Sequence, residues 1–83
     1  MQNEVSLAIR LARVASGKTQ WDIAKRVGLH PVQVNYIERG KRAPDADTVK
    51  RMMRAIEIDA PKSALAALVL KESRRVLGEA YAT

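Results

Sequence analysis

The sequence contains no cysteine and no phenylalanine, and its aromatic residues are one Trp and two Tyr. Without cysteine the chain can form neither a disulfide nor a thiolate metal site, and one histidine, His30, cannot hold a metal ion alone. We therefore expect no metal and no cofactor. The residues also do not indicate an enzyme, because no nucleophile lies beside a base and no glycine loop suited to a phosphate is present.

Long hydrophobic runs are missing as well. No segment approaches the roughly 18 consecutive apolar residues that cross a bilayer. The N-terminus lacks the basic start and unbroken apolar stretch of a signal peptide. We therefore expect a cytoplasmic protein that is not inserted in a membrane.

Positive charge, in contrast, is abundant, and the net charge is +6. Residues 10–54 hold eleven Lys or Arg against four Asp or Glu, a net of +7, whereas residues 55–83 hold four of each sign. Such a balance favours an anionic partner, either nucleic acid or an acidic membrane surface. The charge distribution assigns this partner to the first two thirds of the chain, and the balanced tail argues against a membrane role there.

Length and composition limit the fold. The 83 residues leave room for a single domain, residues 1–83, with one modest core. The chain is 47% hydrophobic and rich in Ala, Val, Leu and Arg, which form helices or pack between them. We predict an all-α domain.

The first two helices are delimited by glycine and by a capping residue. Over residues 4–16 the apolar residues recur at helical spacing, and Gly17 then stops the helix. Thr19 is a good N-cap for a second helix of about two turns, which Gly28 ends. This second helix is therefore short.

The third helix runs from Pro31 to Arg39, because proline suits a first helical position, where its missing N–H had no partner in the helix. Asp45 or Asp47 can cap a fourth helix that closes near Ile58. The fifth predicted helix extends from residue 62 to about residue 82. Residues 4–58 then form the core of the domain, and residues 61–82 its C-terminal helix.

The second and third helices are separated by a turn of three or four residues centred on Gly28. This is the layout of the DNA-reading helix-turn-helix, whose second helix enters the major groove. At this point the sequence resembles the Cro and lambdoid-repressor class of helix-turn-helix proteins, called the XRE family. The resemblance spans Leu7 to Ile58 without a gap and rests on Ile9, Arg10, Arg13, Thr19, Gln20, Ala24, Gly28, Val34, Ile37, Glu38, Gly40, Pro44, Thr48, Val49, Met52 and Ile56.

The resemblance implies a five-helix, lambda-repressor-like domain that binds double-stranded DNA. It implies that Ala24 is small because the second and third helices cross closely there. It also implies that Arg13 pairs with Glu38, either as a partly buried tie or as a solvated surface pair. Gln20 would contact a phosphate, unless it is simply a polar residue of the first turn.

The outward face of the third helix supplies the candidate base contacts. Val34 and Ile37 define its core side, and successive residues are rotated by about 100°. Gln or Asn can pair bidentately with adenine, Arg with guanine, and an apolar side chain can meet a thymine methyl group. The candidates are Val32, Gln33, Asn35, Tyr36 and Arg39.

Several of these assignments leave alternatives open. Tyr36 would contact a base or, equally, a phosphate or sugar. His30 would touch the DNA or serve as a poor N-cap, and Trp21 would pack against the first helix or lie along the DNA backbone. The lambdoid repressors place polar readers where this chain has Pro31 and Val32, so their target sequence cannot be transferred. The predicted phosphate contacts are Lys18, Gln20, Lys41 and Arg42.

The fifth helix is apolar over a wider arc than docking on a small bundle requires. We expect part of it to face a second copy, giving a homodimer that reads two half-sites about 34 Å apart. Such a dimer would be a transcriptional regulator, most simply a repressor, on a palindromic operator. Alternatively, Leu65, Leu68 and their neighbours complete the monomer core, or the helix binds a different protein, as in an antitoxin.

Overall fold

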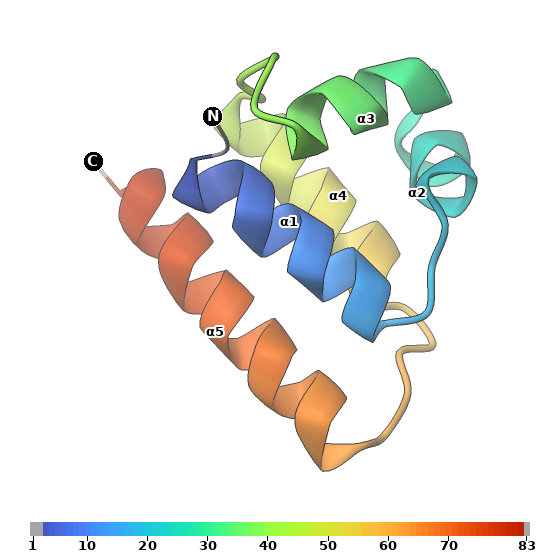
Figure 1. Ribbon diagram of the computed structural model, residues 1–83, viewed down its shortest axis with the longest axis vertical. Coiled ribbons are helices and arrows are strands. Elements are labelled where there is room, and N and C mark those ends of the chain that lie inside the picture. The colour runs from blue at the N-terminus through green and yellow to red at the C-terminus, as the bar shows by residue number, and fades with distance from the viewer. Residues whose placement is uncertain (1–2, 83) are drawn as a thin grey trace.

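The structure is a computed structural model that describes residues 3–82 (Figure 1). No strand is present within this range, so the predicted all-α class is confirmed. None of the helices in residues 3–82 is both long and apolar enough to cross a membrane. The helices are α1 (Glu4–Ala15), α2 (Gln20–Val27), α3 (Pro31–Glu38), α4 (Ala46–Glu57) and α5 (Ala64–Ala80).

Polar side chains fix where the helices begin. Thr19 caps α2, and its hydroxyl oxygen accepts the Asp22 N–H at 3.1 Å. Of the two predicted caps for α4, Asp45 is the one in use, and its carboxylate accepts the Thr48 N–H at 2.8 Å. These bonds satisfy N–H groups that have no partner within the helix.

Helix α5 begins later than predicted. It starts at Ala64 instead of residue 62, because the Ser63 hydroxyl oxygen accepts the Ala66 N–H at 3.0 Å and so caps the helix there. At its other end the helix continues through Gly78 to Ala80. Figure 1 shows α5 alongside α1, at the edge of the molecule away from α3.

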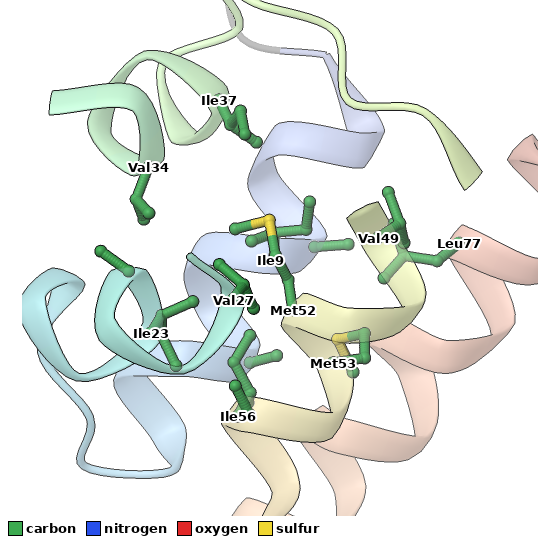
Figure 2. Close-up of a cluster of buried hydrophobic side chains, with 14 of the residues drawn as sticks. Ile9, Ile23, Val27, Val34, Ile37, Val49, Met52, Met53, Ile56 and Leu77 are labelled. Atoms are coloured by element: carbon green, nitrogen blue, oxygen red, sulfur yellow. The ribbon is translucent and has the colours of Figure 1, made fainter. Parts of the chain in front are cut away.

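The core lies between the first four helices, with α5 added on one side. Its most deeply buried side chains are branched aliphatic residues and methionine, which fill the space that phenylalanine occupies in many proteins. Figure 2 shows these side chains converging from α1 to α4, with Leu77 reaching in from α5. Those at most 1% exposed include Ile9, Ile23, Val34, Ile37, Met52 and Ile56.

Besides the exposed ion pair between Arg74 and Glu57 of α4, two hydrogen bonds to backbone carbonyl groups attach α5 and its C-cap to the rest of the molecule. The Ser73 hydroxyl donates to the Ala8 carbonyl oxygen at 3.0 Å, and the Tyr81 hydroxyl donates to the Pro44 carbonyl oxygen at 2.6 Å. Burial raises the pKa of the Tyr81 phenol. Leu65 and Leu68 are not part of the core, since 72% and 65% of their surfaces are exposed. The alternative that the apolar residues of this helix complete the monomer core is therefore wrong for Leu65 and Leu68, whereas their neighbours Ala66 and Leu70 are buried in that core.

Candidate nucleic-acid interface

The turn between α2 and α3 depends on the backbone conformation of Gly28. Gly28 has φ 75° and ψ 30°, the left-handed region that side-chain-bearing residues rarely adopt. A Cβ added there would meet its nearest atom, Nη2 of Arg51, only at 4.0 Å. Space is therefore not the constraint, and glycine is needed for the left-handed turn that sends the chain into α3.

The start of α3 is closed by a reciprocal pair of hydrogen bonds between His30 and Gln33. His30 is the N-cap, and its Nδ1 accepts the Val32 N–H at 3.1 Å. In return, Oε1 of Gln33 accepts the backbone N–H of His30 at 2.9 Å. This is a capping box with histidine in the position usually held by serine or threonine. His30 is thus an effective cap, contrary to the expectation of a poor one.

The outward row of α3 is exposed as predicted from its helical spacing. Val32 is 47% exposed and Tyr36 44% exposed, and Arg39 at the C-cap is exposed too. Val34 and Ile37 are buried on the opposite side. The helix therefore presents an apolar, an aromatic and a cationic side chain in one row.

Glu38 anchors the other end of α3. Its two carboxylate oxygens accept Nε of Arg13 at 2.6 Å and Nη2 of Arg13 at 2.9 Å, and Nε2 of Gln20 donates to Oε1 at 3.2 Å. Glu38 is 1% exposed, so the Arg13–Glu38 contact implied by the resemblance is a buried bidentate pair and not a solvated one. It joins α1, the first residue of α2 and the last residue of α3.

A polar hollow of about 230 Å³ opens beside this anchor. Within residues 3–82, no hydrogen bond or ion pair occupies the side chains of Arg10 and Arg39, which face it from α1 and from the end of α3. Asn35 lies at its wall, half-buried. With three arginines and one glutamate, the hollow is suited to an anion. It is lined by Arg10, Arg13, Gln20, Asn35, Glu38 and Arg39.

Comparison with protein families gives one result that fits this geometry. Residues 9–62, from α1 to the segment before α5, match the model of the helix-turn-helix family HTH_3. The chain belongs to the XRE-type helix-turn-helix family. This family consists of DNA-binding transcription regulators, and its domain is not enzymatic. No curated protein and no solved structure gives a match.

Within the helix-turn-helix, Ala24 is buried, and its helix α2 packs against both α3 and α4. Gln20 stands at the first position of α2, where it also reaches Glu38, so its amide is held in place while one of its two N–H hydrogens is left over. Lys41 and Arg42 are exposed in the loop after α3. The backbone N–H groups of these two residues both donate to the Tyr36 carbonyl oxygen. These positions are compatible with the roles predicted from the sequence.

Lys18 requires a correction. Its ammonium group donates to the carbonyl oxygen of Ile56 at 2.9 Å and also to that of Ile58. A cation at this end of α4 satisfies carbonyl groups that the helix leaves without partners and interacts favourably with the helix dipole. Lys18 therefore serves the helix-turn-helix fold as a C-terminal cap of α4, and we remove it from the phosphate contacts.

Trp21 also differs from one of its two expectations. It is 68% exposed in the first turn of α2, so it does not pack against α1 or the preceding loop. Arg10, which carries part of the family resemblance but is not among the predicted contacts, is a further candidate for an anion contact because its side chain lines the polar hollow. Its signal was an arginine three positions before the predicted tie residue Arg13, on the same side of α1.

Proposed function

We propose that this helix-turn-helix regulator represses transcription by binding a palindromic DNA site as a homodimer, with α3 of each copy in a major groove. The observation that carries the proposal is the outward row of Val32, Tyr36 and Arg39 on a helix anchored at both ends. Base edges are read by side chains held on a rigid element, and the caps and the Glu38 anchor supply that rigidity.

The phosphate contacts come from both sides of α3. Lys41 and Arg42 follow the helix, and Arg10 of α1 lines the hollow beside its last turn. Gln20 and the N-terminus of α2 add neutral donors. Cations on either side of a reading helix fix its position in the groove but carry no sequence information. Affinity should therefore fall steeply as salt is raised.

A groove between α1 and α5 supports the dimer. It encloses about 480 Å³, and α1 contributes Leu7 and Leu11 while α5 contributes Leu68. These side chains are exposed, and Leu65 and Val14 beside them are exposed as well. An apolar surface of this kind is typical of an interaction site. Acidic and basic residues both line the groove, so in a two-fold dimer an acidic residue of one copy can face a basic residue of the other.

A second copy seated on this groove leaves the reading helix uncovered, because α5 lies at the edge away from α3 (Figure 1). Two such helices, related by a two-fold axis, require two half-sites of opposite orientation. A different protein on the same groove would instead leave the chain monomeric on DNA. Oligomeric state therefore separates the homodimer from the antitoxin-like alternative.

The experiment that tests the proposal is selection of bound duplexes from a random library at low and moderate salt. We expect an enriched palindrome whose affinity depends strongly on salt. Arg39→Ala should change the enriched sequence, whereas Arg74→Ala, the same loss of charge on α5, should not. The proposal is wrong if the protein holds random and genomic duplexes equally loosely at both salt concentrations.

A further inference from the structure

The capping box at the start of α3 determines which hydrogen-bonding groups this end of the helix can offer to DNA. A backbone N–H can only donate, so the atom of Gln33 that faces the His30 N–H at 2.9 Å must be the carbonyl oxygen Oε1. The amide nitrogen Nε2 is then the other end of the side chain. The acceptor Oε1 of Gln33 is therefore bonded to the backbone, and the two hydrogens on Nε2 remain available to donate to DNA.

The same argument fixes the tautomer of His30. The Val32 N–H points at Nδ1 of the imidazole at 3.1 Å, so Nδ1 must carry a lone pair. The proton of the neutral ring then sits on Nε2, on the far side of an exposed side chain. His30 and Gln33 thus each use an acceptor to cap the helix and keep a donor.

The two residues between His30 and Gln33 do not change this balance. Pro31 and Val32, the two residues between His30 and Gln33, have no hydrogen-bonding side-chain atoms. The first turn of α3 also contains no acidic residue. The leading end of the reading helix is therefore built from donors and one apolar side chain.

We propose that Gln33 and His30 read acceptor atoms of the DNA, N7 and O6 of guanine, and that Gln33 does not form the bidentate pair with adenine. Adenine presents an acceptor, N7, beside a donor, the N6 amino group, and a glutamine reads both only if Oε1 and Nε2 face the base together. Guanine presents two acceptors and suits a donor alone. This inference rests on the proposed function, since it assumes that α3 enters the major groove.

The decisive variant is Gln33→Glu. A glutamate still accepts the His30 N–H, and glutamate is a preferred residue at this position of a capping box. The variant should therefore keep its helix content and thermal midpoint while losing the donors. We expect its preference for guanine at one position of each half-site to fall by roughly ten- to one-hundred-fold. Cytosine, whose N4 amino group donates, should gain there.

The control for the added negative charge is Asn35→Asp, the same amide-to-carboxylate change two residues later on the same helix. It should weaken binding and can change the preference at the base that Asn35 itself faces, but it should leave the guanine preference opposite Gln33 in place. His30→Ser keeps a capping oxygen but removes the Nε2 donor. We expect it to fold normally and to lose base preference only at a position next to the one that Gln33 reads.

The probe is the duplex that the wild-type protein selects from the library. The position read by Gln33 is the one at which Gln33→Ala loses its base preference. Replacing guanine there by 7-deazaguanine removes N7 and should weaken wild-type binding but not Gln33→Glu binding. Replacing it by inosine keeps N7 and O6 and should change little. An adenine at this position, or no position that responds to Gln33, overturns the inference while the regulator assignment stands. A library without any enriched site overturns both.

Discussion

Helices α3 and α5 lie on opposite sides of α1 and are attached to it by different chemistry. The end of α3 is joined to α1 by a buried ion pair, and its outward row is flanked by exposed cations. Helix α5 is attached by apolar packing and one buried hydroxyl, and its exposed side towards α1 is apolar. One helix therefore suits a polyanion and the other an apolar protein surface. The difference suggests that the two helices bind different partners.

The largest effect should come from breaking the ion pair that anchors α3. Glu38→Ala leaves the Arg13 guanidinium nearly buried without its carboxylate, which costs about 3–5 kcal/mol of unfolding free energy. Glu79→Ala removes the same side chain from an exposed pair with Arg75 on α5 and should cost less than about 1 kcal/mol. Thermal unfolding followed by far-ultraviolet circular dichroism measures both. Equal midpoints for the two variants would contradict the contrast between the helices.

The next effect concerns the apolar side of α5. Leu68→Lys places an ammonium group in the groove between α1 and α5, and burial of a leucine contributes about 1.5–3 kcal/mol to an interface. We expect dimerisation to weaken at least roughly tenfold in sedimentation equilibrium. Ala67→Lys, the same new side chain one residue earlier and outside the groove lining, should leave the dimer unchanged. A wild-type protein that stays monomeric at tens of micromolar would refute the interface.

A smaller effect distinguishes the cations of the two regions. Lys41→Ala, in the loop after α3, should weaken binding to every sequence alike and reduce the salt slope by about one. Lys71→Ala removes the same charge from the exposed face of α5 and should change neither quantity. Titration of one labelled duplex at several salt concentrations measures both variants. The assignment of the basic loop to DNA fails if the two slopes are the same.

The smallest effect is in the N-cap of α4, which is a titratable carboxylate. The hydrogen bond from the Thr48 backbone lowers the pKa of Asp45 below its ordinary value of 3.8. The folded pKa is depressed, so this cap stabilises α4 above about pH 4 and is lost as the pH falls through the lower folded value. Asp45→Asn keeps an accepting oxygen at every pH and should reduce the loss of thermal midpoint between pH 5 and pH 2.5.

Ser63, the cap of α5, does not titrate in this range, so Ser63→Asn serves as the matched change. It should leave the acid dependence as it is in the wild type. If Asp45→Asn loses as much thermal midpoint between pH 5 and pH 2.5 as the wild type and Ser63→Asn do, protonation of Asp45 does not weaken the cap of α4.

Local signals in the sequence were sufficient to predict most of the fold. Thr19, Gly28 and Pro31 act within one turn of the chain, and the structure places a cap, a left-handed turn and a helix start at these residues. The start of α5 at Ala64 could not be predicted in this way, because Lys62 is compatible with a helix. The structure shows that the Ser63 hydroxyl caps the helix, so that it begins one residue later.

The site was less accessible from the sequence, because its residues have partners distant in the chain. Lys18 looked like a phosphate contact, but its ammonium group lies against carbonyl oxygens of Ile56 and Ile58, 38 and 40 residues away. A glutamine at position 33 can pair with adenine by its residue type, but its oxygen accepts the backbone N–H of His30, which the sequence does not reveal. The groove between α1 and α5 could not be seen from α5 alone, since half of its apolar side chains belong to α1.

The exposure of Trp21 makes the protein its own optical probe. The indole, the strongest emitter in a chain with one tryptophan and two tyrosines, already meets water in the folded state. Its fluorescence should therefore respond little to heat unfolding of the core. A duplex that settles on the first turn of α2 covers or quenches the indole, so the emission of the unlabelled protein can be used to titrate a ligand at that surface.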